Sequence, residues 1–406
     1  MEREINVQKL RFPEFKGEWK SIKLGDLFQN RRQKGNENLP IFSVTQDRGL
    51  ISRDSLDRKM QNDAKPEDNL YVESNDLVYN MMRMWQGAIG ISNQSCMVSP
   101  AYIVLKPNEN VCSKFFIQLF QKNRSLYLFT SYSYGLTSDR LRLYYKDFSD
   151  IKFYIPQYSE QQKVSNFLST IDDKLTQLKK KKSLLEQYKK VVMQKIFSQE
   201  LRFIDENGED FKDWEEKSLG EIGETYNGLT GKSKENFGSG KPYIQYKQIF
   251  DDTKIDISRF EYVEINNNEK QKKVKFGDVF FTVSSETPDE VGMSSVLLNN
   301  IDELYLNSFC FGYRLFSFDV LNPNYARYLF RSDLFRKEVI TLAQGSTRYN
   351  LSKIGMMKLK INLPSLHEQT KIFNFLSTLD DKINNYVTQI VKIEGWKKGL
   401  LQLMFV

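Results

Sequence analysis

NFLSTIDDK at residues 166–174 and NFLSTLDDK at residues 374–382 differ at a single position. The likeness extends over residues 156–174 and 364–382, where 12 of 19 positions are identical without a gap. A chain of 406 residues exceeds what one hydrophobic core usually serves. The duplicated stretch therefore predicts two similar halves.

Both copies have the pattern of a long helix. Each opens with a proline and then Glu-Gln, with Ser159 or His367 just before, which predicts helix starts near 159 and 367. Apolar residues follow with a period of seven, as in a coiled-coil seam. Helices of about 40 residues would reach about 60 Å, so we expect the two to pair as an antiparallel coiled coil. The alternative is that each is an amphipathic helix packed on its own domain.

The repeated residues have two expected roles in these helices. The apolar ones are expected to pack in the seam, and the aspartates to stay exposed enough to meet a partner. The seam residues are Phe167, Leu168, Ile171, Phe375, Leu376 and Leu379, and the aspartates are Asp172, Asp173, Asp380 and Asp381.

The segments before the two helices also correspond, more faintly. Leu10-Arg11-Phe12 parallels Leu201-Arg202-Phe203, and Gly135-Leu136-Thr137 parallels Gly345-Ser346-Thr347. Short β-rich runs such as IFSV and DVFFTV alternate with turns, and helical stretches follow near 112–130 and 323–343, which predicts an α+β fold. We expect domains at 1–155 and 204–363, alternating with spacer helices at 156–203 and 364–406, in an internal pseudo-two-fold repeat.

Composition limits the classes of function. Hydrophobic residues make up 40% and charged residues 27% of the chain, there is no apolar run of about 18 residues, and the first residues are charged, so we expect a cytoplasmic protein. The net charge of +7 is uneven, with +5 over 1–155 and −4 over 204–363. If the second domain holds nucleic acid, it must use a local patch or a partner's help.

Catalytic patterns are incomplete. The single histidine, His367, argues against His-based metal sites and catalytic triads, and the three cysteines lack metal-type spacing. Asn322-Pro323-Asn324-Tyr325 resembles the base-gripping motif of adenine methyltransferases but lacks its second proline, and we interpret it as a turn leading into a helix. We therefore expect no catalytic and no metal-binding residues, and a chain that is not itself an enzyme.

The paired IP-x-x-x-EQQKV-x-x-FLSTIDDK and LP-x-x-x-EQTKI-x-x-FLSTLDDK stretches, each after a variable domain with a G-x-T motif, resemble the specificity (S) subunits of type I restriction-modification enzymes. The resemblance covers essentially the whole chain. It implies two target-recognition domains that each read one half of a bipartite double-stranded DNA site, and spacer helices that dock two methyltransferase subunits. It also implies restriction subunits in the full complex. S-adenosylmethionine, ATP and Mg would be bound by the partners, with no cofactor on this chain.

Base edges are read by Arg, Lys, Asn and Gln, while Ser, Thr and basic residues also hold phosphates. Such residues in turn-rich loops are our candidates for DNA binding, although each is also typical of a solvated surface. In the first domain they are Arg31, Arg32, Lys34, Gln46, Arg48, Arg83, Thr137, Arg140 and Arg142. In the second they are Lys232, Lys234, Gln245, Lys247, Ser284, Ser285, Thr347, Arg348 and Tyr349.

The first domain's Arg31-Arg32-Gln33-Lys34 has no close match in the second, so the two half-sites are expected to differ. Two other classes of function stay open. One is a structural coiled-coil protein without a DNA role, and the other is a fused, self-sufficient methyltransferase or nuclease.

Overall fold

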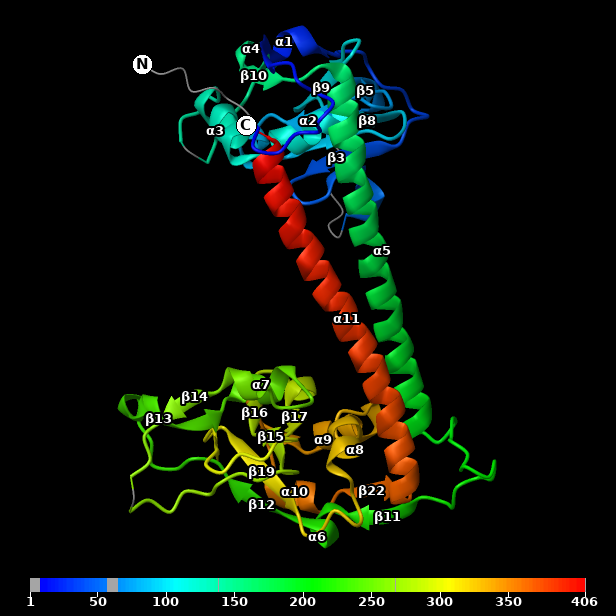
Figure 1. Cartoon of the computed structure of the whole chain (residues 1–406), viewed down its shortest axis with the longest axis vertical. Helices are drawn as coiled ribbons and strands as arrows, with labels where there is room; N and C mark the ends of the chain where they lie inside the picture. Colours follow the sequence, from blue (N-terminus) through cyan, green and yellow to red (C-terminus); the bar gives the residue numbers. More distant parts are fainter. Residues whose placement is uncertain (1–7, 57–64, 138, 267, 406) are drawn as a thin grey trace. The chain divides into compact units, whose positions relative to one another are not determined.

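A computed structural model describes residues 8–56, 65–137, 139–266 and 268–405 (Figure 1). The chain has an α+β fold that divides into two compact units, residues 1–179 with 388–406 and residues 180–387. Each unit contains one globular part and a portion of each of two long helices, α5 (Tyr158–Phe197) and α11 (Leu366–Met404). Both helices begin within one residue of the predicted starts.

The globular part of the first unit has two four-stranded sheets, in the orders β2-β9-β6-β7 and β4-β3-β8-β5, and a separate pair β1-β10. All pairings are antiparallel except β3 with β8. The strands are β1 (Lys20–Lys23), β2 (Phe28–Asn30), β3 (Ile41–Thr45), β4 (Gly49–Ser52), β5 (Leu70–Val72), β6 (Leu77–Asn80), β7 (Ile89–Ile91), β8 (Cys96–Val98), β9 (Tyr102–Pro107) and β10 (Lys152–Ile155). The helices are α1 (Leu24–Leu27), α2 (Ser113–Phe120), α3 (Asn123–Ser131) and α4 (Tyr145–Asp150).

Two apolar clusters stabilise this globular part. Valines from three strands, Val72 of β5, Val78 of β6 and Val98 of β8, meet in a core together with Cys96. Around α2, aromatic rings pack edge to face, for example Phe28 against Phe116 with ring centroids 5.0 Å apart. The runs expected to form strands and the helical stretch near 112–130 are therefore present.

The globular part of the second unit has sheets in the orders β12-β19-β15-β17, β14-β13-β18 and β16-β21-β20, and a pair β11-β22. Its strands are β11 (Glu215–Ser218), β12 (Gly223–Asn227), β13 (Phe237–Ile244), β14 (Glu261–Val263), β15 (Val279–Thr282), β16 (Ser284–Ser285), β17 (Ser294–Val296), β18 (Tyr305–Leu306), β19 (Cys310–Leu315), β20 (Ala343–Gln344), β21 (Tyr349–Leu351) and β22 (Lys360–Leu363). Its helices are α6 (Leu219–Ile222), α7 (Tyr246–Asp251), α8 (Pro323–Leu329), α9 (Asp333–Thr341) and α10 (Lys353–Met357).

Both long helices contribute to the core of the second unit. Ile372, Leu376 and Leu379 from α11 and Val192 and Ile196 from α5 are buried in one cluster with the central sheet. The apolar rows identified in the sequence thus contact the globular part as well as the other helix. No described helix combines the length and apolar character that crossing a membrane requires.

The start of each long helix is fixed by a buried glutamate. Glu160 is 1% exposed and accepts hydrogen bonds from the guanidinium of Arg11, at 2.7 and 2.6 Å, and from the indole of Trp19, at 3.3 Å. Glu368 is fully buried and accepts from Arg202, at 3.3 and 3.0 Å, and from Trp214, at 3.2 Å. A buried carboxylate needs such partners, which explains why Glu-Gln is repeated.

The neighbouring glutamines connect each helix to the globular part. Gln161 donates to the carbonyl of Pro156 and accepts from the backbone N–H of Cys112, and Gln369 repeats this arrangement with Pro364 and Asn322. The contacts of Glu160 and Gln161 lie within the first unit, and those of Glu368 and Gln369 lie within the second. The repeated sequence therefore encodes how each domain is held on its helix.

The phenylalanines of the repeat have a similar role. Phe167 contacts Phe12, with centroids 5.7 Å apart, and Phe375 contacts Phe203, at 5.8 Å. Phe167 also meets Trp396 of α11 at 6.0 Å. Leu168 and Leu376 are fully buried, and Ile171 and Leu379 are each 6% exposed, as the prediction of apolar packing requires.

The aspartates of the repeat divide into two kinds. The carboxylate of Asp380 is bound by Lys189, Arg327 and Tyr328, and Asp172 by Lys397. The expectation that the aspartates stay exposed enough to meet a partner is wrong for Asp380, whose side chain is 18% exposed and held by three groups, but stays a prediction for Asp172, whose side chain is 39% exposed. Asp173 and Asp381 are exposed.

Candidate nucleic-acid interface

Each globular part has a glycine turn beside the end of its central strand. In the first, the backbone N–H of Leu143 donates to the carbonyl of Met81, just past β6. In the second, the N–H of Leu351 donates to the carbonyl of Val283, just past β15. The turns that contain Gly135 and Gly345 therefore lie at corresponding places in the two domains.

Glycine is required at both turns. A Cβ on Gly135 would lie 2.4 Å from the carbonyl oxygen of Arg140, and one on Gly345 would lie 2.1 Å from that of Arg348. Gly345 also has a φ of +135°, which other residues rarely adopt. The turns hold Arg140 and Arg348 at equivalent positions, and both arginines are exposed.

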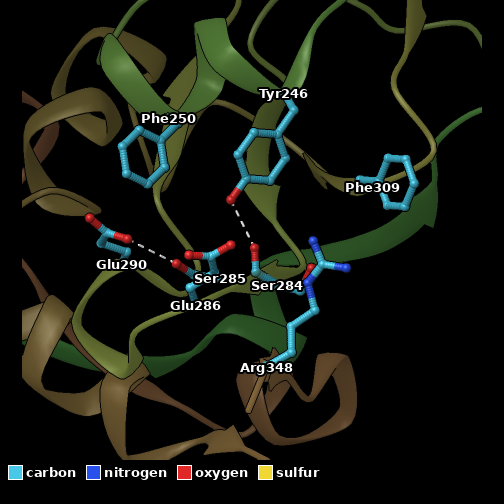
Figure 2. Close-up of a pocket in the computed structure, with 8 residues that line it drawn as sticks. All are labelled: Tyr246, Phe250, Ser284, Ser285, Glu286, Glu290, Phe309 and Arg348. Atoms are coloured by element: carbon cyan, nitrogen blue, oxygen red, sulfur yellow. Dashed lines mark hydrogen bonds between the residues drawn. The ribbon is translucent and has the colours of Figure 1, made fainter.

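A pocket of about 410 Å³ opens beside Arg348 in the second domain (Figure 2). Figure 2 shows rings, carboxylates and the guanidinium of Arg348 around one hollow. The lining residues are Tyr246, Phe250, Ser284, Ser285, Glu286, Glu290, Phe309 and Arg348.

Internal contacts fix several of the pocket's side chains. The rings of Tyr246 and Phe250 stack with centroids 6.1 Å apart, and the hydroxyl of Tyr246 donates to the carbonyl of Ser284 at 2.8 Å. Burial raises the pKa of Tyr246, so the phenol keeps its proton as a donor. The hydroxyl of Ser285 donates to Glu290 at 3.0 Å. These internal contacts hold the walls of the pocket in place.

Two charged groups of the pocket have no such contacts. Among the described residues, no side-chain hydrogen bond or ion pair involves the guanidinium of Arg348 or the carboxylate of Glu286, and both residues are exposed. Phe309 is also 63% exposed, at the side of the pocket near Arg348 (Figure 2). The arrangement presents a fixed aromatic wall, one free cation and one free anion.

The other predicted DNA contacts are distributed over loops of both domains. Gln245, Ser284 and Tyr349 are half-buried, and Ser285 is buried. The exposed ones are Arg32, Lys34, Gln46, Arg48, Arg83, Thr137, Arg140, Arg142, Lys234, Lys247, Thr347 and Arg348. Only Ser284, Ser285 and Arg348 meet in the pocket, and DNA contact by the exposed residues stays a prediction.

Two candidates have structural roles instead. Arg31 is 12% exposed in its side chain and is bound by Asp76, at 2.7 Å, and by Glu73. The Lys232 side chain is 4% exposed and bound by Glu269 at 2.6 Å. Since each cation is already neutralised inside its domain, neither is presented to a phosphate or a base. Arg314 contacts Asp278 in the second domain much as Arg31 contacts Asp76 in the first.

The pocket residues that sequence reasoning missed are aromatic or acidic. The sequence did not predict them, because basic, amide and hydroxyl side chains were expected at a DNA surface; they are Tyr246, Phe250, Phe309, Glu286 and Glu290. The available signal was the position of Ser284-Ser285-Glu286 directly after a buried strand, where functional side chains are commonly presented.

The segment that resembles a methyltransferase motif is a helix start, as predicted. The side chain of Asn322 accepts from the backbone N–H of Asn324 at 2.9 Å, Pro323 opens α8, and Tyr325 is fully buried. A fully buried ring cannot grip a base. Within the described ranges, no group of three or more His, Cys, Asp or Glu residues is placed to hold a metal ion.

Comparison with known proteins agrees with this architecture. The model of the type I restriction modification DNA specificity domain matches residues 16–187 and 211–394. The MjaVIII type I restriction enzyme specificity subunit of Methanocaldococcus jannaschii is 24% identical over 97% of this chain and 93% of its own length. A putative MjaX specificity subunit from the same organism is 30% identical over 53% of this chain and 51% of its own.

Solved structures show the same fold. A specificity subunit from M. genitalium superposes with a TM-score of 0.57 at 15% identity, covering 98% of this chain and 99% of the other. A chain from a study of assembly and conformational transition in a type I restriction-modification system superposes with a TM-score of 0.55 at 16% identity, covering 96% of this chain and 97% of the other.

Proposed function

Because this chain belongs to the type I restriction-modification DNA specificity family, we propose that it is the DNA-reading subunit of a methyltransferase complex. Each globular part reads one half of an asymmetric, bipartite site on double-stranded DNA. The two long helices set the spacing between the half-sites, and catalysis belongs to partner subunits.

The observation that carries the proposal is the pair of equivalent glycine turns with different surroundings. Arg140 and Arg348 occupy corresponding positions. The strand ends that these turns adjoin carry Met82-Arg83 in the first domain and Ser284-Ser285-Glu286 in the second. Because base edges are distinguished by their donors, acceptors and methyl groups, such different side chains favour two different half-sites.

The helices are suited to act as a spacer. In the first unit Lys397 of α11 binds Asp172 of α5, and in the second Lys189 of α5 binds Asp380 of α11. Asp172 and Asp380 are 208 positions apart in sequence, as are Lys189 and Lys397, so each ion pair is the counterpart of the other in the repeat. This correspondence supports an antiparallel coiled coil with a pseudo-two-fold relation. Modules on a stiff spacer contact DNA a fixed distance apart, so their short sequences are separated by an unread gap.

The helices also offer surfaces to partners. Leu184, Tyr188 and Val191 recur at helical spacing on α5 and are about half exposed, although they are large and apolar. We infer that this face, with Asp173 and Asp381, docks methyltransferase subunits, two in the full assembly. Restriction subunits would join it, S-adenosylmethionine would bind the methyltransferase, and ATP and Mg would bind the partners.

The test is to map methylated adenines in DNA exposed to the complex of this chain with its methyltransferase subunits. The expected result is one bipartite motif with unequal halves. Exchanging residues 20–150 for those of another member of the family should change one half only, and a change in both halves would contradict modular reading.

Two outcomes favour other functions. Methyl transfer by the purified chain alone would establish a self-sufficient enzyme. A complex that protects no defined sequence on DNA would favour a purely structural coiled-coil protein.

A further inference from the structure

Resting on the proposed function, we propose that the pocket beside β16 and β21 reads one G·C base pair in the half-site of the second domain. In this reading Arg348 contacts the guanine and Glu286 contacts the cytosine. Neither residue's role follows from membership of the family, since both roles depend on the particular charges that line this pocket.

The carboxylates exclude the simplest alternative, a phosphate site. Of the described residues that line the pocket, Arg348 alone is basic, whereas Glu286 and Glu290 are both acidic. A phosphate would be repelled by two carboxylates at close range. Acidic residues at a DNA surface are instead suited to accept from an amino group, and the amino group of cytosine is such a donor in the major groove.

Of the two carboxylates, Glu286 is the one available to a base. Glu290 already accepts from the hydroxyl of Ser285 at 3.0 Å, which fixes its orientation. Glu286 is exposed and has no described partner. The pocket thus contains one carboxylate that is already hydrogen-bonded, Glu290, and one that is available to accept from a base, Glu286.

Arg348 supplies the complementary half of the contact. Its guanidinium is free, and its backbone is fixed by the close approach of Gly345. A planar guanidinium can donate two parallel bonds to the two acceptors of guanine. In Figure 2 its head group extends toward Ser284 and Phe309, across the pocket from Phe250.

An A·T pair fits these groups less well. Its thymine presents a methyl group where cytosine presents the amino donor. Glu286 would then be desolvated against an apolar group without gaining a hydrogen bond, which is costly. The stacked rings of Tyr246 and Phe250 offer no replacement, because the hydroxyl of Tyr246 already donates to the carbonyl of Ser284.

The experiment uses the complete complex with Arg348→Ala or Glu286→Gln and sequences the methylated sites in a randomised DNA library. Arg140→Ala is the matched control, because Arg140 occupies the equivalent turn of the first domain. For each variant, preference at every position of the motif is compared with that of the unmodified complex.

Arg348→Ala and Glu286→Gln should both lower preference at the same G·C position, by about 5- to 150-fold for the arginine, as expected for loss of a bidentate contact. Arg140→Ala should leave that half-site unchanged. If Arg348→Ala instead lowered methylation equally for all sequences, as expected for loss of a phosphate contact, the proposal would be overturned. Relaxation at an A·T position, or at different positions for the two variants, would also overturn it.

Two safeguards keep the outcomes distinct. If the unmodified complex produces no bipartite motif, the proposed function fails before the pocket is tested. If Arg348→Ala does not fold, as judged by circular dichroism, Glu286→Gln carries the decision, because it keeps the size of an exposed side chain while replacing one acceptor oxygen of the carboxylate by an NH2 donor.

Discussion

Replacing Arg202 by alanine should loosen the second unit specifically, because it leaves the carboxylate of Glu368 without its cation. Glu368 is fully buried and bonded to Arg202 and Trp214. The hydrogen bond from Arg202 to Glu368 raises the pKa of Arg202, so its guanidinium keeps its positive charge at neutral pH. Trp214 alone would then have to hold a buried negative charge.

The size of the effect follows from this burial. Removing one partner of a buried ion pair costs about 3–5 kcal/mol, compared with about 5–15 kcal/mol for the whole stability of a typical domain. Arg202 is 22% exposed in its side chain, so water can partly replace it, and we expect a loss near 3 kcal/mol. Exposed ion pairs contribute less than about 1 kcal/mol.

Hydrogen exchange followed by mass spectrometry can measure this loss unit by unit. Peptides from the start of α11 should exchange about 100-fold faster in Arg202→Ala, whereas peptides from the start of α5 should not change. Arg11→Ala is the matched variant and should give the opposite pattern, since Arg11 binds Glu160. Replacing Arg202 and Glu368 together by methionine should recover most of the protection, because no buried charge remains.

Either of two results would refute the reasoning. An Arg202→Ala protein with unchanged exchange at the start of α11 would mean that Glu368 does not depend on its cation. Equal loosening of both units would mean that the two anchors are not separate.

Three further predictions concern other contacts. In urea titrations, Asp380→Asn should lower the free energy of unfolding by about 2 kcal/mol, and Asp172→Asn should lower it by less than about 1 kcal/mol. The difference is expected because the side chain of Asp380 is 18% exposed and has three partners, whereas that of Asp172 is 39% exposed and has one. The hydrogen bond from Lys232 lowers the pKa of Glu269 to about 2. The contribution of this pair to the stability of the fold should therefore be complete above pH 4.5 and disappear as the pH falls to about 2. NMR titration should show the pKa of Glu269 returning toward 4.5 in Lys232→Ala. Gly345→Ala should lower the melting temperature and weaken reading of the second half-site only, because its Cβ would meet backbone; unchanged melting would contradict the turn geometry.

Local pattern was enough to predict much of the fold. The helix starts, several strands and the apolar rows depend on periodicity and capping, which are encoded by neighbouring residues. The repeat of Glu-Gln was visible in the sequence, but its role was not, because Glu160 is bound by Arg11 from 149 positions away.

The candidate site was harder to predict for the same reason. Arg31 has the composition of a DNA contact, and only the fold places Asp76 against it. Conversely, Glu286 has the wrong charge for a simple DNA-binding residue. The proposed role of Glu286 depends on its position beside Arg348 and the aromatic wall, which are far away in sequence.

The division of each long helix between two units has a consequence for the order of synthesis. The second unit is continuous, so it can be completed once residue 387 has left the ribosome. The first unit must wait for residues 388–406, whose Phe405 packs on Phe115 with ring centroids 5.3 Å apart and whose Leu403 carbonyl accepts from the N–H of Leu10. The unit whose synthesis begins first is therefore completed last, and a premature stop codon just after residue 387 would destabilise the first unit while leaving every residue of the second in place.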